Sequence, residues 1–448
     1  MNPDTHISQK SITLTAISSG IISLGDLSKV QRNDRDIVIA AVSYNGSCLK
    51  WASKRLRGDK DIVFTAVSSS AVALQYASPV LRADYDVVQT AVKKCGLALE
   101  WASPELQNNK LVVENAIKNG TNVLMWASNT LRDDEQIVLL AVSKYGRDLK
   151  YASERLRKKY EIVLAAVQSD GNAVQFASPE LRADRSIMFT AVSHKGSLKW
   201  ASPKLRADKN LVLAAVKSDG ENIQFVSDEL CADEEVVLAA VKSNGHALAW
   251  SDAFQSNKQI VLAAVENDGY VFLYASPELQ MDPDIIFNAA MADAHILQLI
   301  PKSACTNYDL MLKIVSAKGS ALKYMDQHAQ TNRDIVLAAV KNDPWAIAYA
   351  SEELKANREI ILSAVSQNGS TLMFASNFLR NDIDIVYAAV SSSSNSIIYA
   401  DPQIIKNFEF IKMILHMNVP VYGYELQRAK ILMGCVPSTL LPLLIKLV

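Results

Sequence analysis

The stretch Asp59-Lys-Asp-Ile-Val-Phe-Thr-Ala-Val-Ser-Ser-Ser, residues 59–70, decides the fold. Its apolar residues fall at offsets 0, 1, 4 and 5, which place them on one stripe of a helix: Ile62, Val63, Ala66 and Val67. Phe64 widens this stripe, as is typical of a helix packed between neighbours. Asp59 is suited to cap the helix, because its carboxylate accepts hydrogen bonds from the amides of the first turn. The stretch therefore predicts a short amphipathic helix.

The Ala-Val pair of this helix returns along almost the whole chain. Of the sixteen gaps between its anchor residues, fourteen are 25 residues and two are 24. A fixed period in this range indicates a stacked repeat array, in which each unit buries its apolar surface against its neighbours. We therefore predict an all-α fold, an α-solenoid superhelix of about sixteen to seventeen 25-residue repeats in a single elongated domain. The anchors are Ala16, Ala41, Ala66, Ala91, Ala116, Ala141, Ala166, Ala191, Ala215, Ala240, Ala264, Ala289, Ile314, Ala339, Ala364, Ala389 and Ile414.

Other columns of the repeat have predictable structural roles. Asp or Asn precedes the long helix in every unit but the one with Lys159, and these side chains suit helix N-caps. A glycine column, exemplified by Gly46 and Gly146, is expected to end the helix in the left-handed conformation. A second short helical segment should follow, and then serines such as Ser78, with Pro79 behind it, predict a further helical turn.

The solenoid is expected to span residues 11–430, after an N-terminal tail at 1–10. The pattern is weakest near 289–314, where Leu299 replaces an aromatic residue and Pro301 replaces a serine, so a bend in the superhelix is predicted there. Residues 431–448 are strongly apolar and are expected to cover the last repeat. A tail anchor in the membrane is the alternative for this segment, although its glycine and prolines interrupt a run near the short limit for a span.

Composition excludes some classes of function. The chain has 46 Lys and Arg against 47 Asp and Glu, so no general attraction to nucleic acid or to an anionic membrane is expected, and only local patches remain. The five cysteines form no C-x-x-C pair, which indicates a reducing, cytoplasmic environment. The histidines lack metal-ligand spacing, so no metal and no cofactor is predicted.

The unit D-x-[DE]-[IV]-V-L-A-A-V-x-x-x-G-x-x-L-x-[WYF]-A-S-x-x-L-R-x-D resembles a tandem repeat family catalogued as a domain of unknown function, and the resemblance covers roughly residues 10–425. Such repeats occur in proteins of amoeboid protists and in candidate effectors of bacteria that live inside them. The architecture is also similar to leucine-rich variant repeats, which alternate α and 3₁₀ helices. The resemblance implies an interaction protein, secreted without a cleavable signal into a host cytosol.

An aromatic column follows the glycines, and two interpretations of it differ in function. It could stack successive bases of a single-stranded nucleic acid. Its members are more typical of the core between repeats, because phenylalanines and Leu299 enter the same column. They are Trp51, Tyr76, Trp101, Trp126, Tyr151, Phe176, Trp200, Phe225, Trp250, Tyr274, Tyr324, Tyr349, Phe374 and Tyr399.

An arginine column could in the same way be a track for phosphates, but other residues interrupt it and the chain has no excess of positive charge. We therefore expect its arginines to pair with local carboxylates. The members are Arg57, Arg82, Arg132, Arg157, Arg182, Arg206 and Arg380.

Function is sought in the positions that do not repeat. Residues beside the glycine column vary, lie on one edge of the array, and include aromatic and arginine side chains of the kind that anchor interfaces. They predict a binding edge for a protein partner: Tyr44, Tyr145, Arg147, His194, His246, Tyr270 and Trp345. A non-enzymatic scaffold is the leading hypothesis, and a nucleic-acid-binding repeat protein or an enzyme with an unrecognised site are the alternatives. The pattern predicts neither the partner's identity nor an oligomeric state.

Overall fold

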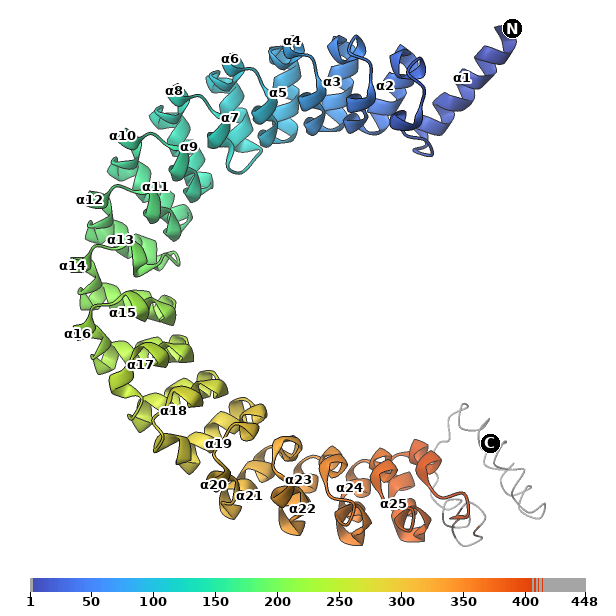
Figure 1. Cartoon of the computed structure of the whole chain (residues 1–448), viewed down its shortest axis with the longest axis vertical. Coiled ribbons are helices and arrows are strands. Elements are labelled where there is room, and N and C mark those ends of the chain that lie inside the picture. The colour runs from blue at the N-terminus through green and yellow to red at the C-terminus, as the bar shows by residue number, and fades with distance from the viewer. Residues whose placement is uncertain (1–2, 405–406, 408–409, 411–412, 414–448) are drawn as a thin grey trace. The chain divides into compact units, whose positions relative to one another are not determined.

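The structure, a computed structural model, describes residues 3–404, 407, 410 and 413 (Figure 1). The predicted all-α repeat array is confirmed, because the described residues form α-helices and 3₁₀ helices and no strand. The chain divides into two compact units, residues 1–230 and 231–448. The division falls inside a short helix, α16 (Asp228–Cys231), and not in a linker. The predicted apolar cap at 431–448 lies outside the described residues.

In the first unit, each repeat consists of a long helix of nine or ten residues, a 3₁₀ helix and a short helical turn. The unit begins with α1 (Pro3–Ser18), so most of the segment predicted as an N-terminal tail is helical. The long helices are α2 (Arg35–Tyr44), α3 (Lys60–Ser69), α5 (Tyr85–Lys94), α7 (Lys110–Lys118), α9 (Glu135–Lys144), α11 (Tyr160–Ser169), α13 (Arg185–Ser193) and α15 (Lys209–Ser218). The 3₁₀ helices are η3 (Gly46–Trp51), η5 (Ala71–Tyr76), η6 (Gly96–Trp101), η7 (Val123–Trp126), η8 (Gly146–Tyr151), η9 (Gly171–Phe176), η10 (Leu198–Trp200) and η11 (Gly220–Phe225). The short turns are η1 (Leu24–Asp26), η2 (Gln31–Asn33), η4 (Leu56–Gly58), α4 (Pro79–Arg82), α6 (Pro104–Gln107), α8 (Asn129–Arg132), α10 (Glu154–Arg157), α12 (Pro179–Arg182) and α14 (Pro203–Arg206).

The second unit repeats the same three elements. Its long helices are α17 (Glu234–Ser243), α18 (Lys258–Asn267), α19 (Pro283–Ala292), α21 (Tyr308–Ala317), α23 (Arg333–Asn342), α24 (Arg358–Gln367) and α25 (Ile383–Ser392). Its 3₁₀ helices are η12 (Gly245–Trp250), η14 (Gly269–Tyr274), η16 (Ala294–Gln298), η17 (Gly319–Tyr324), η18 (Pro344–Tyr349), η20 (Gly369–Phe374) and η22 (Ser394–Tyr399). Its short turns are η13 (Asp252–Phe254), η15 (Leu279–Met281), α20 (Lys302–Cys305), α22 (Gln327–Thr331), η19 (Leu354–Ala356) and η21 (Leu379–Asn381).

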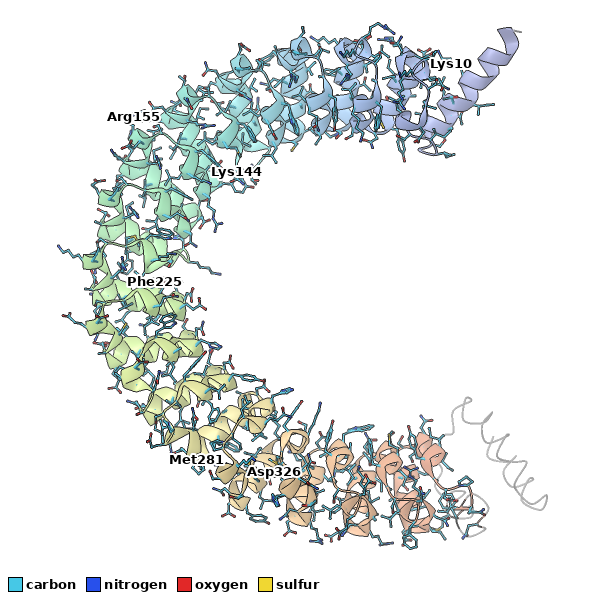
Figure 2. All side chains as sticks on the ribbon, viewed as in Figure 1. Lys10, Lys144, Arg155, Phe225, Met281 and Asp326 are labelled. Atoms are coloured by element: carbon cyan, nitrogen blue, oxygen red, sulfur yellow. The ribbon has the colours of Figure 1, made fainter. Side chains whose placement is uncertain are left out.

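The long helices of each unit stand side by side and point the same way, so each unit has two different edges (Figure 1). We call the edge of the short turns and helix N-termini the cap edge, and the edge of the helix C-termini the loop edge. Figure 2 shows Lys144 of α9 and Arg155 of α10 on opposite edges of the first unit. The loop edge consists of residues 43–47, 68–72, 93–97, 118–122, 143–147, 168–172, 193–197 and 217–221 in the first unit and 242–246, 266–270, 291–295, 316–320, 341–345, 366–370 and 391–395 in the second.

Each long helix is capped and buried as its sequence predicts. In α3 the Asp59 carboxylate accepts hydrogen bonds from the amides of Asp61 (3.1 Å) and Ile62 (3.2 Å). Lys159, which breaks the cap column, gives α11 no side-chain cap. The four predicted stripe residues of α3 are all fully buried, and each of the Ile and Val side chains contributes about 2 kcal/mol of transfer free energy.

The glycine column has a different role from the predicted one. Gly46 and Gly146 lie at the start of a 3₁₀ helix without a left-handed φ, and Gly20 is the one glycine of the described residues with a positive φ. A Cβ added at Gly46 would lie 2.1 Å from the carbonyl oxygen of Ala66, and one at Gly146 would lie 2.2 Å from that of Ala166. The glycine is needed because the backbone of the next long helix passes too close for a side chain.

Two further sets of contacts join successive repeats at the cap edge. The amide of the cap serine donates to a carbonyl of the preceding short turn, as Ser78 does to Arg57 (2.9 Å). A cation in the first turn of a long helix pairs with acids of the next helix, as Lys60 does with Asp84 (2.7 Å) and Asp86 (3.4 Å). The ion pairs are exposed, so each contributes little to stability. The same contacts recur as pairs of Lys10, Arg35, Lys110, Arg185, Lys258, Arg333 and Arg358.

The irregular unit lacks one of these contacts. Ala294 stands in the glycine column, and η16 has five residues where its neighbours η14 and η17 have six. Pro301 replaces the cap serine and has no amide proton, so it cannot donate the inter-repeat hydrogen bond. This junction therefore lacks the hydrogen bond that a cap serine would donate, and the bend near Pro301 stays a prediction.

The glycine contact can be tested by adding one methyl group. We expect Gly146→Ala to lower the free energy of unfolding by about 2 kcal/mol, because the new Cβ forces two close-packed repeats apart. Urea denaturation followed by circular dichroism measures the change. Gly58→Ala is the matched control, because its Cβ would meet nothing nearer than the Ser78 hydroxyl at 3.6 Å. Equal unfolding midpoints for the two variants would contradict the role assigned to the glycine column.

Candidate binding surface

The aromatic column lies on the surface, so the prediction that it forms the core between repeats is wrong. Trp51 is 42% exposed and Trp250 is 54% exposed, and every other member of the column is half-buried or exposed. The buried residue of each 3₁₀ helix is instead the aliphatic one two places earlier. Leu49 and Leu248, for example, are completely inaccessible to solvent. Figure 2 shows Phe225 of the column between the two edges of the first unit. Each unit therefore has a row of half-exposed aromatic side chains across its 3₁₀ helices, which we call the aromatic row.

The variable residues beside the glycine column touch this row. The imidazole of His246 lies edge-on to the Tyr274 ring, with centroids 5.9 Å apart. Trp345 meets Phe374 in the same way at 6.0 Å, and His295 packs on Tyr324 at 4.1 Å. Each pair joins a loop-edge residue of one repeat to the aromatic residue of the next. The variable loop edge and the aromatic row thus form one continuous surface in the second unit.

All seven sequence-predicted site residues lie on the loop edge, four in the first unit and three in the second. Tyr44 is 61% exposed, Trp345 44%, Tyr270 39% and Tyr145 37%. The remaining three have partners within the chain. Arg147 pairs with Asp170 (2.6 Å), the Nδ1 of His194 lies 2.9 Å from the carbonyl oxygen of Thr190, and the Nε2 of His246 lies 3.0 Å from Asp268. That these residues bind a partner stays a prediction.

The arginine column is not paired with the expected carboxylates. The guanidinium of Arg206 donates to the Ala201 carbonyl (3.1 Å), and Arg380 donates to that of Ala375 (2.9 Å). Gln280, which replaces arginine in the column, makes the equivalent contact with Ala275 (3.0 Å). Arg132 donates to the Leu124 carbonyl, and the Nε atoms of the other four arginines are buried without a hydrogen-bond partner. Nitrogens that are buried or bonded to backbone do not suit a phosphate track.

Lysines accompany several aromatic rings, and the sequence interpretation overlooked them. The ammonium group of Lys50 lies 4.9 Å from the centroid of the Trp51 ring. Lys150, Lys199 and Lys323 lie 5.1–5.5 Å from Tyr151, Trp200 and Tyr324 in the same way. A cation over a ring face is attracted by the ring quadrupole. The available signal was the recurring Lys-aromatic dipeptide before Ala-Ser.

One acid differs from the periodic cap carboxylates. Asp148 in η8 is 1% exposed and faces no cation, and burial raises its pKa to about 7. A raised pKa can mark a catalytic acid. Here the carboxylate accepts a hydrogen bond from the Leu124 amide of the preceding repeat, and its Oδ1 is buried without a partner. Asp148 is therefore part of a repeat junction.

The described residues contain neither a metal-ligand cluster nor a membrane-spanning helix. Within the described part of the chain, no three His, Cys, Asp or Glu side chains gather as the ligands of a metal ion would. None of the helices in that part has both the length and the apolar character of a membrane span.

Comparison with known proteins identifies the repeat. The family described as Domain of unknown function (DUF4116) matches residues 10–57, 34–82, 59–107, 109–157, 160–206, 208–252, 257–303, 307–355 and 357–405. The chain therefore belongs to this family, as the resemblance of the repeat predicted. Each match spans two of the 25-residue units, and the first three start one unit apart. No curated protein and no solved structure matches the chain. The association with amoeboid protists and their bacteria stays a prediction.

Asp148 predicts an unusual dependence of stability on pH. Its folded-state pKa, about 7, lies above the ordinary value of 3.8, so the folded state binds the proton more tightly. The stability due to protonated Asp148 is complete below about pH 4 and is lost as the pH rises through about 7. We expect Asp148→Asn to raise the free energy of unfolding by about 2 kcal/mol at about pH 8 and to change it little at about pH 4.

The urea midpoints of the two proteins at both pH values measure this effect. Asp170→Asn is the control, because Asp170 is half-exposed and paired with Arg147. A gain from Asp148→Asn that is the same at both pH values would contradict the buried, protonatable carboxyl.

Proposed function

We propose that the protein is a non-enzymatic scaffold that binds another protein along the surface formed by the loop edge and the aromatic row. The observation that carries the proposal is the continuity of half-exposed aromatic side chains from repeat to repeat. Tyr270, Tyr274, Trp345 and Tyr349 are 37–44% exposed in the second unit. Rigid aromatic side chains that are already half-desolvated make good interface anchors, because they bury area at little entropic cost.

Structural positions and variable positions are separate within the repeat, and this separation supports a binding role. Structural positions hold the same residue types in most units, whereas the loop-edge positions that meet the aromatic row hold His246, Tyr270, His295 and Trp345 in turn. A regular array of anchors with variable neighbours gives a long surface whose specificity is set locally. The roles found for the acids, as helix caps, ion-pair partners and one junction carboxyl, support a scaffold over an enzyme.

The cellular setting is proposed from the resemblance described above. Repeats of this kind in candidate effectors of intracellular bacteria support a role in the cytosol of a eukaryotic host. The five cysteines are compatible with that reducing compartment, and Cys48, Cys95 and Cys305 have free thiols.

Affinity capture from host lysate tests the scaffold. We expect the double variant Tyr270→Ala and Trp345→Ala to lose the captured partner, with recovery reduced by about tenfold, because two central anchors are removed. Proximity labelling in host cells provides an independent measurement of the same partner.

The control variant carries Tyr308→Ala and Phe378→Ala. These residues are 42% and 82% exposed on the cap edge of the same unit, so the same kind of area is removed from the other edge. Equal recovery of the partner by both double variants would exclude the proposed surface.

A single-stranded nucleic acid is the second candidate, because half-exposed aromatic rings can stack on bases. Two observations count against it. The Nε atoms of the arginine column either donate to backbone carbonyls or are buried, and lysines occupy a face of several rings. We therefore expect no mobility shift of single-stranded RNA or DNA at low salt. Retardation that is lost on Trp51→Ala but kept on Phe64→Ala, a similarly exposed ring on a long helix, would establish the nucleic-acid role.

A further inference from the structure

The loop edge of the first five long-helix repeats is basic. Its segments 43–47, 68–72, 93–97, 118–122 and 143–147 contain five cations and no acid: Lys93, Lys94, Lys118, Lys144 and Arg147. The rest of the loop edge is mixed. Asp170, Asp219 and Glu221 enter it later in the first unit, and the loop edge of the second unit contains four acids and three lysines. The positive charge is therefore local in a chain whose net charge is only −1.

Except for Glu100 in η6, Glu114 in α7 and the buried Asp148, the acids of these repeats lie on the opposite edge. They occupy the caps and first turns of the long helices, where they pair with cations of the preceding helix, as Asp61 does with Arg35 (2.6 Å). Each long helix is about 15 Å long, which is more than the Debye length at physiological salt. The acids of the cap edge therefore do little to neutralise the loop edge.

The five cations differ in whether their charged groups already have partners within the chain. Lys144 donates to the carbonyls of Ile117 (3.1 Å) and Lys118 (2.6 Å), and Lys94 donates to that of Ser68, so both close the end of the preceding long helix. Arg147 pairs with Asp170. Lys93 and Lys118 are exposed, and the described residues give their ammonium groups no hydrogen bond or ion pair. These two charges are available to a ligand.

Apolar side chains lie among the cations. Leu97 is 39% exposed on the loop that follows α5, and Tyr145 is 37% exposed at the end of α9. The ammonium group of Lys144 lies 5.6 Å from the centroid of the Tyr145 ring. Charged and apolar groups thus alternate across the ends of three successive long helices.

We propose that this basic loop edge, from α5 to α9, binds an extended acidic polypeptide segment in which apolar residues are interspersed with carboxylates. The carboxylates pair with Lys93 and Lys118, and the apolar residues cover Leu97 and Tyr145. The inference deepens the proposed function and rests on it, because it names the partner's chemistry at one part of the scaffold surface. Charge complementarity of this kind steers the encounter and fixes the register of the bound segment.

A polypeptide fits this surface better than a nucleic acid does. The ring of Tyr145 has the Lys144 ammonium group over it, and Tyr151 in the adjoining 3₁₀ helix has Lys150 over it at 5.5 Å. A ring face occupied by a cation does not stack on a base. Carboxylates and aliphatic side chains need no free ring face.

Fluorescence anisotropy with the full chain tests the proposal. The probe is a fluorescein-labelled peptide of alternating glutamate and leucine, and its matched control is the same peptide with glutamine for glutamate. We expect the acidic peptide to bind with an affinity that falls as salt is added, and the neutral peptide to bind at least about tenfold more weakly.

Charge reversal locates the site. We expect the double variant Lys93→Glu and Lys118→Glu to bind the acidic peptide about tenfold more weakly than the unmodified chain does. The control is Lys242→Glu with Lys341→Glu, because these lysines are exposed at the same helical positions of α17 and α23. That variant should change the affinity by less than about twofold. Urea midpoints confirm that both variants are folded.

Three results would overturn the proposal. The first is equal weakening of peptide binding by the two double variants, and the second is equal binding of the acidic and neutral peptides. The third is that the peptide does not bind, whereas single-stranded oligouridine binds and its binding is lost on Lys93→Glu and Lys118→Glu. Absence of peptide binding together with a partner capture that depends on Tyr270 and Trp345 would overturn this inference alone. Absence of both would overturn the scaffold as well.

Discussion

The close approach of each glycine to the alanine carbonyl of the next long helix is the contact on which the array depends. A Cβ on Gly46 would lie only 2.1 Å from the Ala66 carbonyl oxygen, so the two repeats are closer than any side chain there would permit. That distance lets the buried Ala-Val pairs meet, and it brings the cap serine within hydrogen-bonding reach of the preceding turn. Five junctions carry Ala71, Thr121, Ala294, Pro344 or Ser394 in the glycine column, so their local spacing must admit a Cβ.

A second consequence of the repeat is that acidic and basic side chains gather on different edges. Within each unit the long helices run in the same direction, so their N-terminal acids reach one edge and their C-terminal lysines the other, as the helix dipole favours. On the cap edge the acids are matched by cations one repeat earlier; Arg185, for example, lowers the pKa of Asp208 below its ordinary value. The loop edge has no such systematic matching. Its charge is set by residues that vary from unit to unit, so this edge can differ along the chain without disturbing the fold.

The sequence was sufficient to predict the period, the helix caps and the placement of the seven candidate residues on one edge, because each depends on local rules. It was misread at the glycine, aromatic and arginine columns, and the first two show why. Gly146 was interpreted through its own φ, but the reason for it is the carbonyl of Ala166, which is 20 residues later and visible only in three dimensions. Trp51 was placed in the core with Leu49. In a 3₁₀ helix of three residues per turn, side chains two apart point in different directions, so only one of this pair can be buried. That error was avoidable once a 3₁₀ helix was recognised.

Departures from the repeat become informative when the neighbouring repeat is considered. The 3₁₀ helices η7 and η10 lack their first turn, and Asn122 and Lys195 there have positive φ. In each case the next repeat carries a buried polar residue: Asp148 accepts from the Leu124 amide, and Asn222 accepts from that of Leu198 at 2.8 Å. These departures are compensated across a junction and so have structural reasons. Lys93, Lys118, Tyr270 and Trp345 are instead exposed on the loop edge. A side chain on that edge can vary without a matching change in the buried junctions, so the fold leaves these positions open to the binding role proposed for them.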